Sequence, residues 1–263
     1  MTVLIDGEDD SDIRCDLYRR YRCRLYFKRE YRWMPGGGVA AGLARRFAFR
    51  HCSEVSTSIF PLPFSVIPGV ASPSLDPPRD VDVSYVVRAS HPKRIRAYTL
   101  LRAATDLKTE TAVYADASDR QSKLQTGLPK VWTKLRGDAL ATEAQRAARL
   151  PYDAYRHLLA RSKMALSVRG GGFDTLRYWE IVSSKALLVS ETPDILIPNN
   201  FESGKHALFC KPDLSDLVPL IRRYVHEDAA RGAMVDAAYA HLHAHHTCSH
   251  RARYLLDLVR QYA

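Results

Sequence analysis

The chain lacks the features that mark membrane, secreted and zinc-bound proteins. No apolar run approaches the roughly 20 residues that a transmembrane helix needs. Its amino terminus, Met-Thr-Val-Leu-Ile-Asp-Gly-Glu-Asp-Asp, is acidic where a secretory signal peptide is basic. Its five cysteines are odd in number and show no C-x-x-C spacing, which favours reduced thiols over disulfides or zinc ligands. We therefore expect a cytoplasmic protein.

Two common catalytic signatures are also missing. The glycine runs are not followed by Gly-Lys-Ser/Thr, which excludes a phosphate-binding P-loop. Ser167 does not lie in a small-x-Ser-x-small elbow, and the sequence shows no local signature of Cys-His catalysis. The chain has no repeat and no low-complexity tract, and its 263 residues allow one large or two small domains.

Positive charge is in excess, with a formal net charge of +10, and it is unevenly placed. The segment 14–50 has eleven Lys and Arg residues against two acids, and aromatic residues alternate with them. Such a segment either binds an anionic surface or partner, nucleic acid included, or is a solvated surface. No helix-turn-helix, zinc-finger or RNA-recognition signature accompanies the charge.

Six prolines between residues 61 and 78 divide the chain. We interpret 61–80 as a stiff, Pro-rich connector, after a partial amino-terminal segment at 1–60 and before a larger domain at 81–263. Short strands are expected at 3–5 and 25–27. In the larger domain we expect strands at 81–88, 111–115, 164–168, 186–190 and 207–209, helices at 92–104, 139–150 and 151–163, and a mostly helical tail from 214 to 262. This alternation predicts an α/β, Rossmann-like fold, with a parallel sheet and helices on both faces.

A run of three glycines, Gly170, Gly171 and Gly172, follows the strand expected at 164–168 and precedes a helix. Asp174 or Thr175 would cap that helix, because a short side-chain oxygen accepts from the unpaired first-turn N–H groups. Glycine lets the backbone approach a ligand closely, and a helix start presents N–H groups and a positive dipole end. The pattern therefore predicts an anion site.

Arg177 and Glu180 lie three residues apart, so they share one face of this helix. A guanidinium suits a diphosphate and a carboxylate suits paired sugar hydroxyls. The alternative is a tight turn between strand and helix in which the two side chains pair with each other.

Lys163 and the histidines of the tail are further candidates. Lys163, just before the strand, would either reach a phosphate or balance the preceding helix dipole. His241 and His245, and also His246 and His250, have the i,i+4 spacing of a zinc pair, but the pairs point in different directions and no acid or cysteine completes a set. We predict no metal site.

From about residue 80 to the end, the order of motifs resembles the carboxyl-terminal half of GT-B glycosyltransferases, and most closely the spore-protein (CgeB-type) branch of the group-1-like families. The matching positions are Tyr155-x-x-Leu-Leu-x-x-Ser162-Lys163, Gly170-Gly-Gly-x-Asp174-Thr175-x-Arg177-x-Trp179-Glu180, Ala186-Leu-Leu-Val-Ser190, and His245-His246-Thr247 with Arg251-Ala-x-Tyr254. In the first 60 residues, Asp6-Gly-Glu-Asp-Asp10 and Phe27-Lys28-Arg29-Glu30 look like pieces of the amino-terminal domain of that branch.

This resemblance implies a nucleotide-diphosphate sugar bound by the 81–263 domain and transfer of its sugar to a saccharide or other acceptor, with no cofactor and no metal. It places the donor ribose on Glu180, the diphosphate near Arg177 and residues 170–172, and His246 at the end of the cleft or as a cap of the last helix. One departure is that Gly172 stands where the earlier acid of a Glu-x7-Glu pair is often found, so the resemblance does not fix retention or inversion.

The amino-terminal segment is shorter than a GT-B acceptor domain. The chain therefore looks like a fragment or a reduced homologue, in which Asp6, Glu8, Asp9 and Asp10 either supply a general base or form a solvated acidic turn. The leading hypothesis is a glycosyltransferase. The alternatives are a non-catalytic binding remnant of such an enzyme and a nucleic-acid binder acting through the basic segment.

Overall fold

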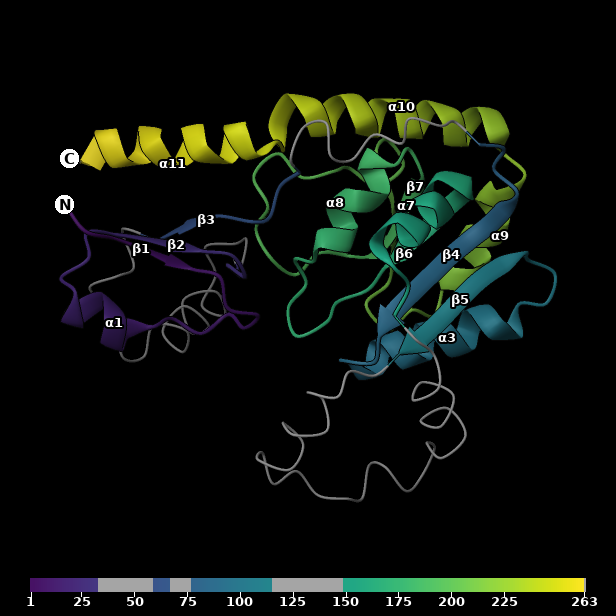
Figure 1. Cartoon of the computed structure of the whole chain (residues 1–263), viewed down its shortest axis with the longest axis horizontal. Coiled ribbons are helices and arrows are strands. Elements are labelled where there is room, and N and C mark those ends of the chain that lie inside the picture. Colours follow the sequence, from purple (N-terminus) through teal and green to yellow (C-terminus); the bar gives the residue numbers. More distant parts are fainter. Residues whose placement is uncertain (33–58, 67–76, 115–148, 263) are drawn as a thin grey trace, which may run out of the picture.

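Two parallel β-sheets organise the chain in the computed structural model, which describes residues 1–32, 59–66, 77–114 and 149–262 (Figure 1). The small sheet has three strands in the order β1 (Val3–Asp6), β2 (Leu25–Lys28), β3 (Ile59–Pro61), with helix α1 (Cys15–Arg20) between the first two in the chain. All residues of β2 are buried, so it is the core of this sheet. The first two strands match the expected ones, whereas β3 begins just before the expected connector.

The large sheet has five strands in the order β5, β4, β6, β7, β8, and every neighbouring pair is parallel. Their bounds are β4 (Val81–Arg88), β5 (Thr109–Tyr114), β6 (Ser162–Ser167), β7 (Leu187–Glu191) and β8 (Leu208–Cys210). The central strands are almost wholly buried, because helices cover both faces of the sheet. The predicted α/β, Rossmann-like fold is confirmed.

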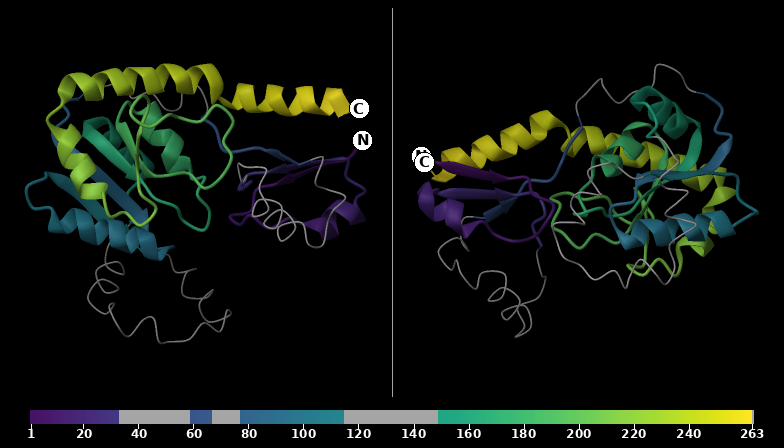
Figure 2. Two further views of the ribbon diagram at one scale, coloured as in Figure 1. Left: turned by 180° about the vertical axis from the view of Figure 1, so that it is seen from behind. Right: turned by 60° about the horizontal axis from the view of Figure 1, so that its bottom comes forward.

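Within the described part of the chain, five helices accompany the large sheet and a sixth, α11 (Cys248–Tyr262), runs along the small sheet (Figures 1 and 2). The five are α3 (Pro92–Ala103), α7 (Tyr152–Arg161), α8 (Leu176–Ser183), α9 (Leu217–Val225) and α10 (Asp228–His245). On one face, Leu101 of α3 and Ile221 of α9 pack with Val83. On the other face, Ile181 of α8 packs with Leu188 and with residues of α7 and α10. The helix expected at 139–150 falls almost wholly outside the described residues.

The chain passes between the two sheets at two places that lie side by side. Residues 62–66 leave the small sheet, and residues 246–248 lead from α10 into α11, which runs back along the small sheet (Figure 1). Val66 joins the two passages, since its N–H donates to the His246 carbonyl at 3.0 Å and its carbonyl accepts from Cys248 N–H at 2.9 Å. The ring of Tyr254 on α11 then meets Phe27 of β2 edge-on. None of the helices in the described ranges has the length and apolarity to cross a bilayer.

Candidate functional site

The order of the large sheet reverses between β4 and β6. Strand β4 pairs with its successor β5 on one side and with β6 on the other. In open parallel sheets, ligands bind outside the carboxyl ends of the strands at such a switch point. We call this border, where β4 to β8 end, the carboxyl edge. The segment after β4 and the glycine loop (residues 168–175) after β6 meet there.

The three glycines of the loop leave room for side chains of the protein itself. A Cβ atom on Gly170 would stand 2.8 Å from Arg94 Nη2, and one on Gly171 would stand 2.7 Å from Asp9 Oδ2. A Cβ on Gly172 would overlap the carboxylate of Glu30. The glycines therefore permit close approach, and in this structure α3 and the amino-terminal segment fill the space.

The expected cap of α8 is absent. Thr175 occupies the N-cap position, yet its side chain makes no capping hydrogen bond and lies 3.4 Å from Ser167 Oγ. Asp174 is turned away from the helix start, because its carboxylate accepts from Phe64 N–H at 2.5 Å and from Trp179 Nε1 at 2.9 Å. Burial raises the pKa of Asp174. The prediction that one of these residues caps α8 is wrong, and Asp174 instead ties the loop to the connector.

Arg94 is the residue at this edge that the sequence analysis missed. It is only 6% exposed. Its Nε donates to the carbonyls of Val168 (3.2 Å) and Arg169 (3.0 Å), and Nη1 donates to the Arg88 carbonyl (3.2 Å) and Ser90 Oγ (3.0 Å). No carboxylate is among these acceptors. Burial, followed by the charge of Arg177, lowers its pKa to about 10, so the guanidinium stays charged at neutral pH. The sequence signal that could have identified Arg94 is its position in the first turn of α3, the helix that follows β4.

Arg177 lies beneath the carboxyl end of β4. Its Nη2 donates to the Val86 carbonyl at 2.8 Å, while its buried Nε has no hydrogen-bond partner. Burial opposes its charge, but the phenol groups of Tyr155 and Tyr85 nearby hold its pKa above the usual value. Both of these tyrosine hydroxyls are buried.

Glu180 lies one turn further along α8. Its carboxylate is half-buried and makes no hydrogen bond or ion pair within the described ranges, so the alternative in which it pairs with Arg177 is not observed. Burial raises its pKa, and the charges of Arg177, Arg149 and Arg156 counteract part of that rise. The carboxylate is therefore free to accept hydrogen bonds from a ligand.

Other cations at the carboxyl edge are paired with acids. Lys93 Nζ lies 2.5 Å from Glu191, whose carboxylate also accepts from the Arg169 N–H at 2.7 Å. The Arg169 guanidinium lies 2.8 Å from Asp194. These pairs contrast with Arg94 and Arg177, for which the structure shows no carboxylate in contact.

Lys163 does not lie at this edge. It is the second residue of β6, at the amino-terminal end of the strand, and its ammonium lies 2.7 Å from Asp82. Because the carboxyl and amino ends of a parallel strand lie at opposite edges of the sheet, the structure does not place Lys163 where it would reach a phosphate at the carboxyl edge.

His246 ends α10 and is fully buried. Its Nε2 donates to the Asn199 carbonyl at 2.8 Å, its Nδ1 accepts from Arg251 at 2.8 Å, and its ring packs 4.8 Å from that of Trp179. Burial, followed by the charge of Arg251, lowers its pKa to about 3, so it is neutral. His246 thus connects the segment around Asn199 to Arg251 of α11, and it does not cap α11. In the described residues no three His, Cys, Asp or Glu side chains are arranged to hold a metal ion.

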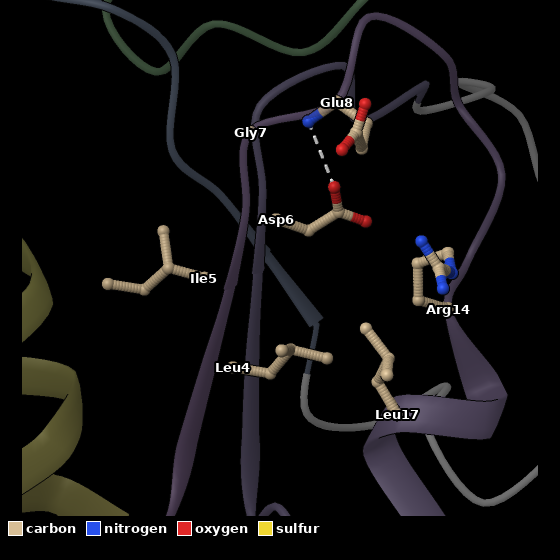
Figure 3. A pocket seen from close by; sticks show the side chains of 7 residues that line it. All are labelled: Leu4, Ile5, Asp6, Gly7, Glu8, Arg14 and Leu17. Carbon is tan, nitrogen blue, oxygen red and sulfur yellow. Dashed lines mark hydrogen bonds between the residues drawn. The ribbon is translucent and has the colours of Figure 1, made fainter.

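A small cavity lies at the end of β1, beside the acidic turn (residues 6–10) and α1 (Figure 3). Its volume of about 110 Å³ is below the range of roughly 300–1,000 Å³ typical of ligand pockets. The lining residues are Leu4, Ile5, Asp6, Gly7, Glu8, Arg14 and Leu17. This cavity is therefore not a donor site.

Three of the four acids of the acidic turn are engaged in ion pairs. Asp6 and Asp10 contact the Lys28 ammonium, and Asp9 contacts Arg29. Burial opposes the charge of Asp6, but hydrogen bonds, first of all from Tyr26, hold its pKa below the usual value. Of the acids expected to include a general base, only the Glu8 carboxylate makes no contact of this kind within the described part of the chain.

The basic segment 14–50 is described only as far as residue 32. In that part Arg14 pairs with Asp16 at 3.2 Å and Arg32 with Asp194 at 3.2 Å, besides Lys28 and Arg29. Several basic residues in the first half of the segment thus form ion pairs with acids of the same chain. The second half lies outside the described residues.

Comparison with known proteins agrees with this geometry. A family model described as "Glycosyl transferase-like" matches residues 96–257, more than half of the chain. The chain belongs to this glycosyl transferase-like family. No curated protein sequence matches it significantly.

Several solved structures share the fold of this chain. HepE from Anabaena, solved with UDP and glucose, is 10% identical, with a TM-score of 0.65 over 98% of this chain and 71% of HepE. S. aureus TarM, solved with UDP among its ligands, is 14% identical, with a TM-score of 0.56 over 97% of this chain and 55% of TarM. Sucrose-phosphate synthase from Thermosynechococcus elongatus is 11% identical, with a TM-score of 0.58 over 93% and 69%. The chain thus spans little more than half the length of TarM.

Proposed function

We propose that this chain binds a nucleoside-diphosphate sugar at the carboxyl edge of the large sheet and transfers the sugar to an acceptor, as a GT-B glycosyltransferase. The observation that supports the proposal most strongly is the pair Arg94 and Arg177. Both guanidiniums are at least partly buried at the switch point, and within the described residues neither contacts a carboxylate. Buried charges are normally paired, so two unpaired cations at one edge fit an anionic ligand.

The donor would lie across α8. Its diphosphate would face Arg177, the uncapped first turn of α8 and the end of β4, where backbone N–H groups and the helix dipole favour negative charge. Its ribose would face Glu180, whose unpaired carboxylate can accept from two hydroxyls. This arrangement assigns the diphosphate and the ribose to the residues that the sequence suggested.

The chemistry of the site would be electrostatic. As the bond from the sugar to the diphosphate breaks, negative charge grows on the leaving oxygen. Arg177 and Arg94 are already fixed near that charge by backbone carbonyls, so they stabilise it without reorganisation. We propose that these cations do this work without a metal ion, that the acceptor is a saccharide, and that the chain acts in the cytoplasm.

Within the superfamily, we propose that the chain belongs to the CgeB-type branch. The terminal signature that suggested this branch includes His246 and Arg251. Arg251 donates a hydrogen bond to His246 Nδ1 and another to the Pro63 carbonyl at 3.1 Å. Residues of the signature therefore connect the two passages between the sheets. This shared structural role is a reason for them to occur together.

A thermal-shift panel of nucleotide sugars and nucleoside diphosphates tests the proposal. A ligand at 100 times its Kd stabilises a protein by about 2.7 kcal/mol, which raises the Tm by roughly 5–10 °C at this size. Arg177→Ala should weaken binding of the nucleoside diphosphate more than that of the nucleoside. The control is Arg222→Ala, which removes an exposed guanidinium paired with Asp106.

Equal loss of nucleoside and diphosphate binding in Arg177→Ala would contradict the diphosphate role, and no shift with any nucleotide would refute the function. An assay of donor turnover then separates an active transferase from a binding remnant. Turnover of a bound donor supports transfer, and tight binding without turnover supports the remnant.

A further inference from the structure

Glu30, which follows β2 by two residues, contacts the glycine loop of the large sheet. Glu30 is only 2% exposed. Its Oε2 accepts from the Phe173 N–H at 2.9 Å, and its Oε1 accepts from the Asp174 N–H at 2.8 Å. Gly172 leaves the room that this carboxylate fills. A side chain from the amino-terminal segment therefore sits directly on the glycine loop.

Two consecutive backbone N–H groups that converge on one negative group form an anion cradle. Here the anion is the Glu30 carboxylate. Other contacts also join the segments on this side, since Leu196 N–H donates to the Tyr31 carbonyl at 2.7 Å and Arg32 pairs with Asp194. Loss of the Glu30 contact alone would leave the two segments attached.

The surroundings of Glu30 do little to compensate its charge. Its neighbour Arg29 makes its ion pair with Asp9 instead. Burial raises the pKa of Glu30, and the nearby Asp174 carboxylate adds to that rise against the two N–H donors. A buried carboxylate that has no cation in contact and faces a second carboxylate is held weakly. An anion with more negative charge, also attracted by Arg94 and Arg177, can compete with it.

We propose that Glu30 is an internal competitor of the donor: it occupies the N–H groups of Phe173 and Asp174 in the ligand-free chain, and a diphosphate displaces it from them. This proposal rests on the proposed function. It assigns those two N–H groups to the phosphate nearer the sugar, because they lie on the side of the loop that faces the amino-terminal segment. Binding of the diphosphate then releases the contact between β2 and the glycine loop.

Calorimetry with inorganic pyrophosphate and with UDP at constant ionic strength tests the competition in the full chain. Glu30→Gln keeps the shape of the side chain but presents an amide donor to one of the N–H groups, and Glu30→Ala removes the side chain. If the contact is closed in about nine of ten molecules, its removal should tighten binding about tenfold. The matched control is Glu8→Gln, which removes the same charge from the exposed acidic turn and should change the Kd less than twofold.

Hydrogen exchange supplies the readout that a purely structural role would not move. Saturating pyrophosphate should leave the Phe173 and Asp174 amides of the wild-type chain protected, while residues 25–30 exchange faster. Unchanged or weaker pyrophosphate binding by both Glu30 variants would overturn the proposal, as would the absence of pyrophosphate binding by all of the proteins. UDP binding that is equal in wild type and variants would leave the proposed function standing and remove the competitor. If the Glu30 variants bind pyrophosphate more tightly but no protein binds a nucleotide, Glu30 competes with a diphosphate and the proposed function fails.

Discussion

At the scale of single residues, several charged groups lie where the structure does not stabilise their charge. Among the residues that the structure describes, the half-buried Glu180 carboxylate has no hydrogen-bond partner, and the buried Arg94 has carbonyl and hydroxyl acceptors only. At position 180, stability alone would favour a neutral side chain. The charged side chains fit the ligand contacts that we propose for them.

Glu180→Gln should raise the Tm by about 2 °C at pH 7.5 and abolish the shift that a nucleotide produces. Because burial raises the pKa of Glu180, its contribution to stability is present below the unfolded pKa near 4.5 and is lost as the pH rises through the folded value. The advantage of the variant should therefore grow from pH 4.5 to pH 7.5. Melting curves at three pH values measure this, with the exposed Glu227→Gln as control; a destabilised Glu180→Gln would indicate a structural role.

Arg94→Met should lower the free energy of unfolding by about 3 kcal/mol, since it leaves the buried carbonyls of Val168 and Arg169 without a donor. Arg102→Met removes an exposed guanidinium from the same helix and should change stability by less than about 0.5 kcal/mol. Denaturant unfolding compares the two. Similar values for both variants would show that Arg94 does not hold the ends of β4 and β6 together.

At the scale of elements, the glycine loop and α8 show what local sequence can and cannot indicate. The strand, the glycines and the helix start were all predictable, because each follows from residues next to one another. Glu30 was not predictable as their partner, because about 140 residues separate it from the loop in sequence. The turn of Asp174 toward Phe64 was hidden for the same reason, since capping preferences consider only the helix itself.

Gly172→Ala should destabilise the chain by about 1–3 kcal/mol, because the new methyl group overlaps the Glu30 carboxylate. In the background of Glu30→Ala the same change should cost less, and a double-mutant cycle measures the difference. Gly232→Ala is the control, since its Cβ on α10 meets nothing within 4 Å. Additive losses at 172 and 30 would show that the two positions do not share this space.

At the scale of the whole molecule, periodicity predicted the fold well. Strand β4 matches its expected bounds, Val81–Arg88, and α3 begins at the proline that was expected to start it. Strand β3 was missed because Ile59–Pro61 ends in the proline from which the connector was read, although a parallel edge strand tolerates that residue at its end. Two residues of the candidate site, Arg177 and Glu180, could be predicted because they share one face of a helix. Arg94 and Glu30 could not, because they come from other elements of the fold.

The charge of the whole carboxyl edge leads to a prediction about metals. If guanidiniums neutralise the diphosphate, addition of EDTA should leave the Tm shift produced by UDP unchanged within about 1 °C. A parallel titration with added Mg²⁺ serves as the control. A shift that disappears with chelator and returns with Mg²⁺ would show that a divalent cation carries part of the charge that we assign to Arg94 and Arg177.

The two hydrogen bonds of Val66 to His246 and Cys248, which join the two passages between the sheets, have a mechanical consequence. Because residues 62–66 and 246–248 are held together there, release of the glycine loop from Glu30 should leave the small sheet tethered at this point. Separation of the two sheets should therefore require the hydrogen bonds of Val66 to break as well.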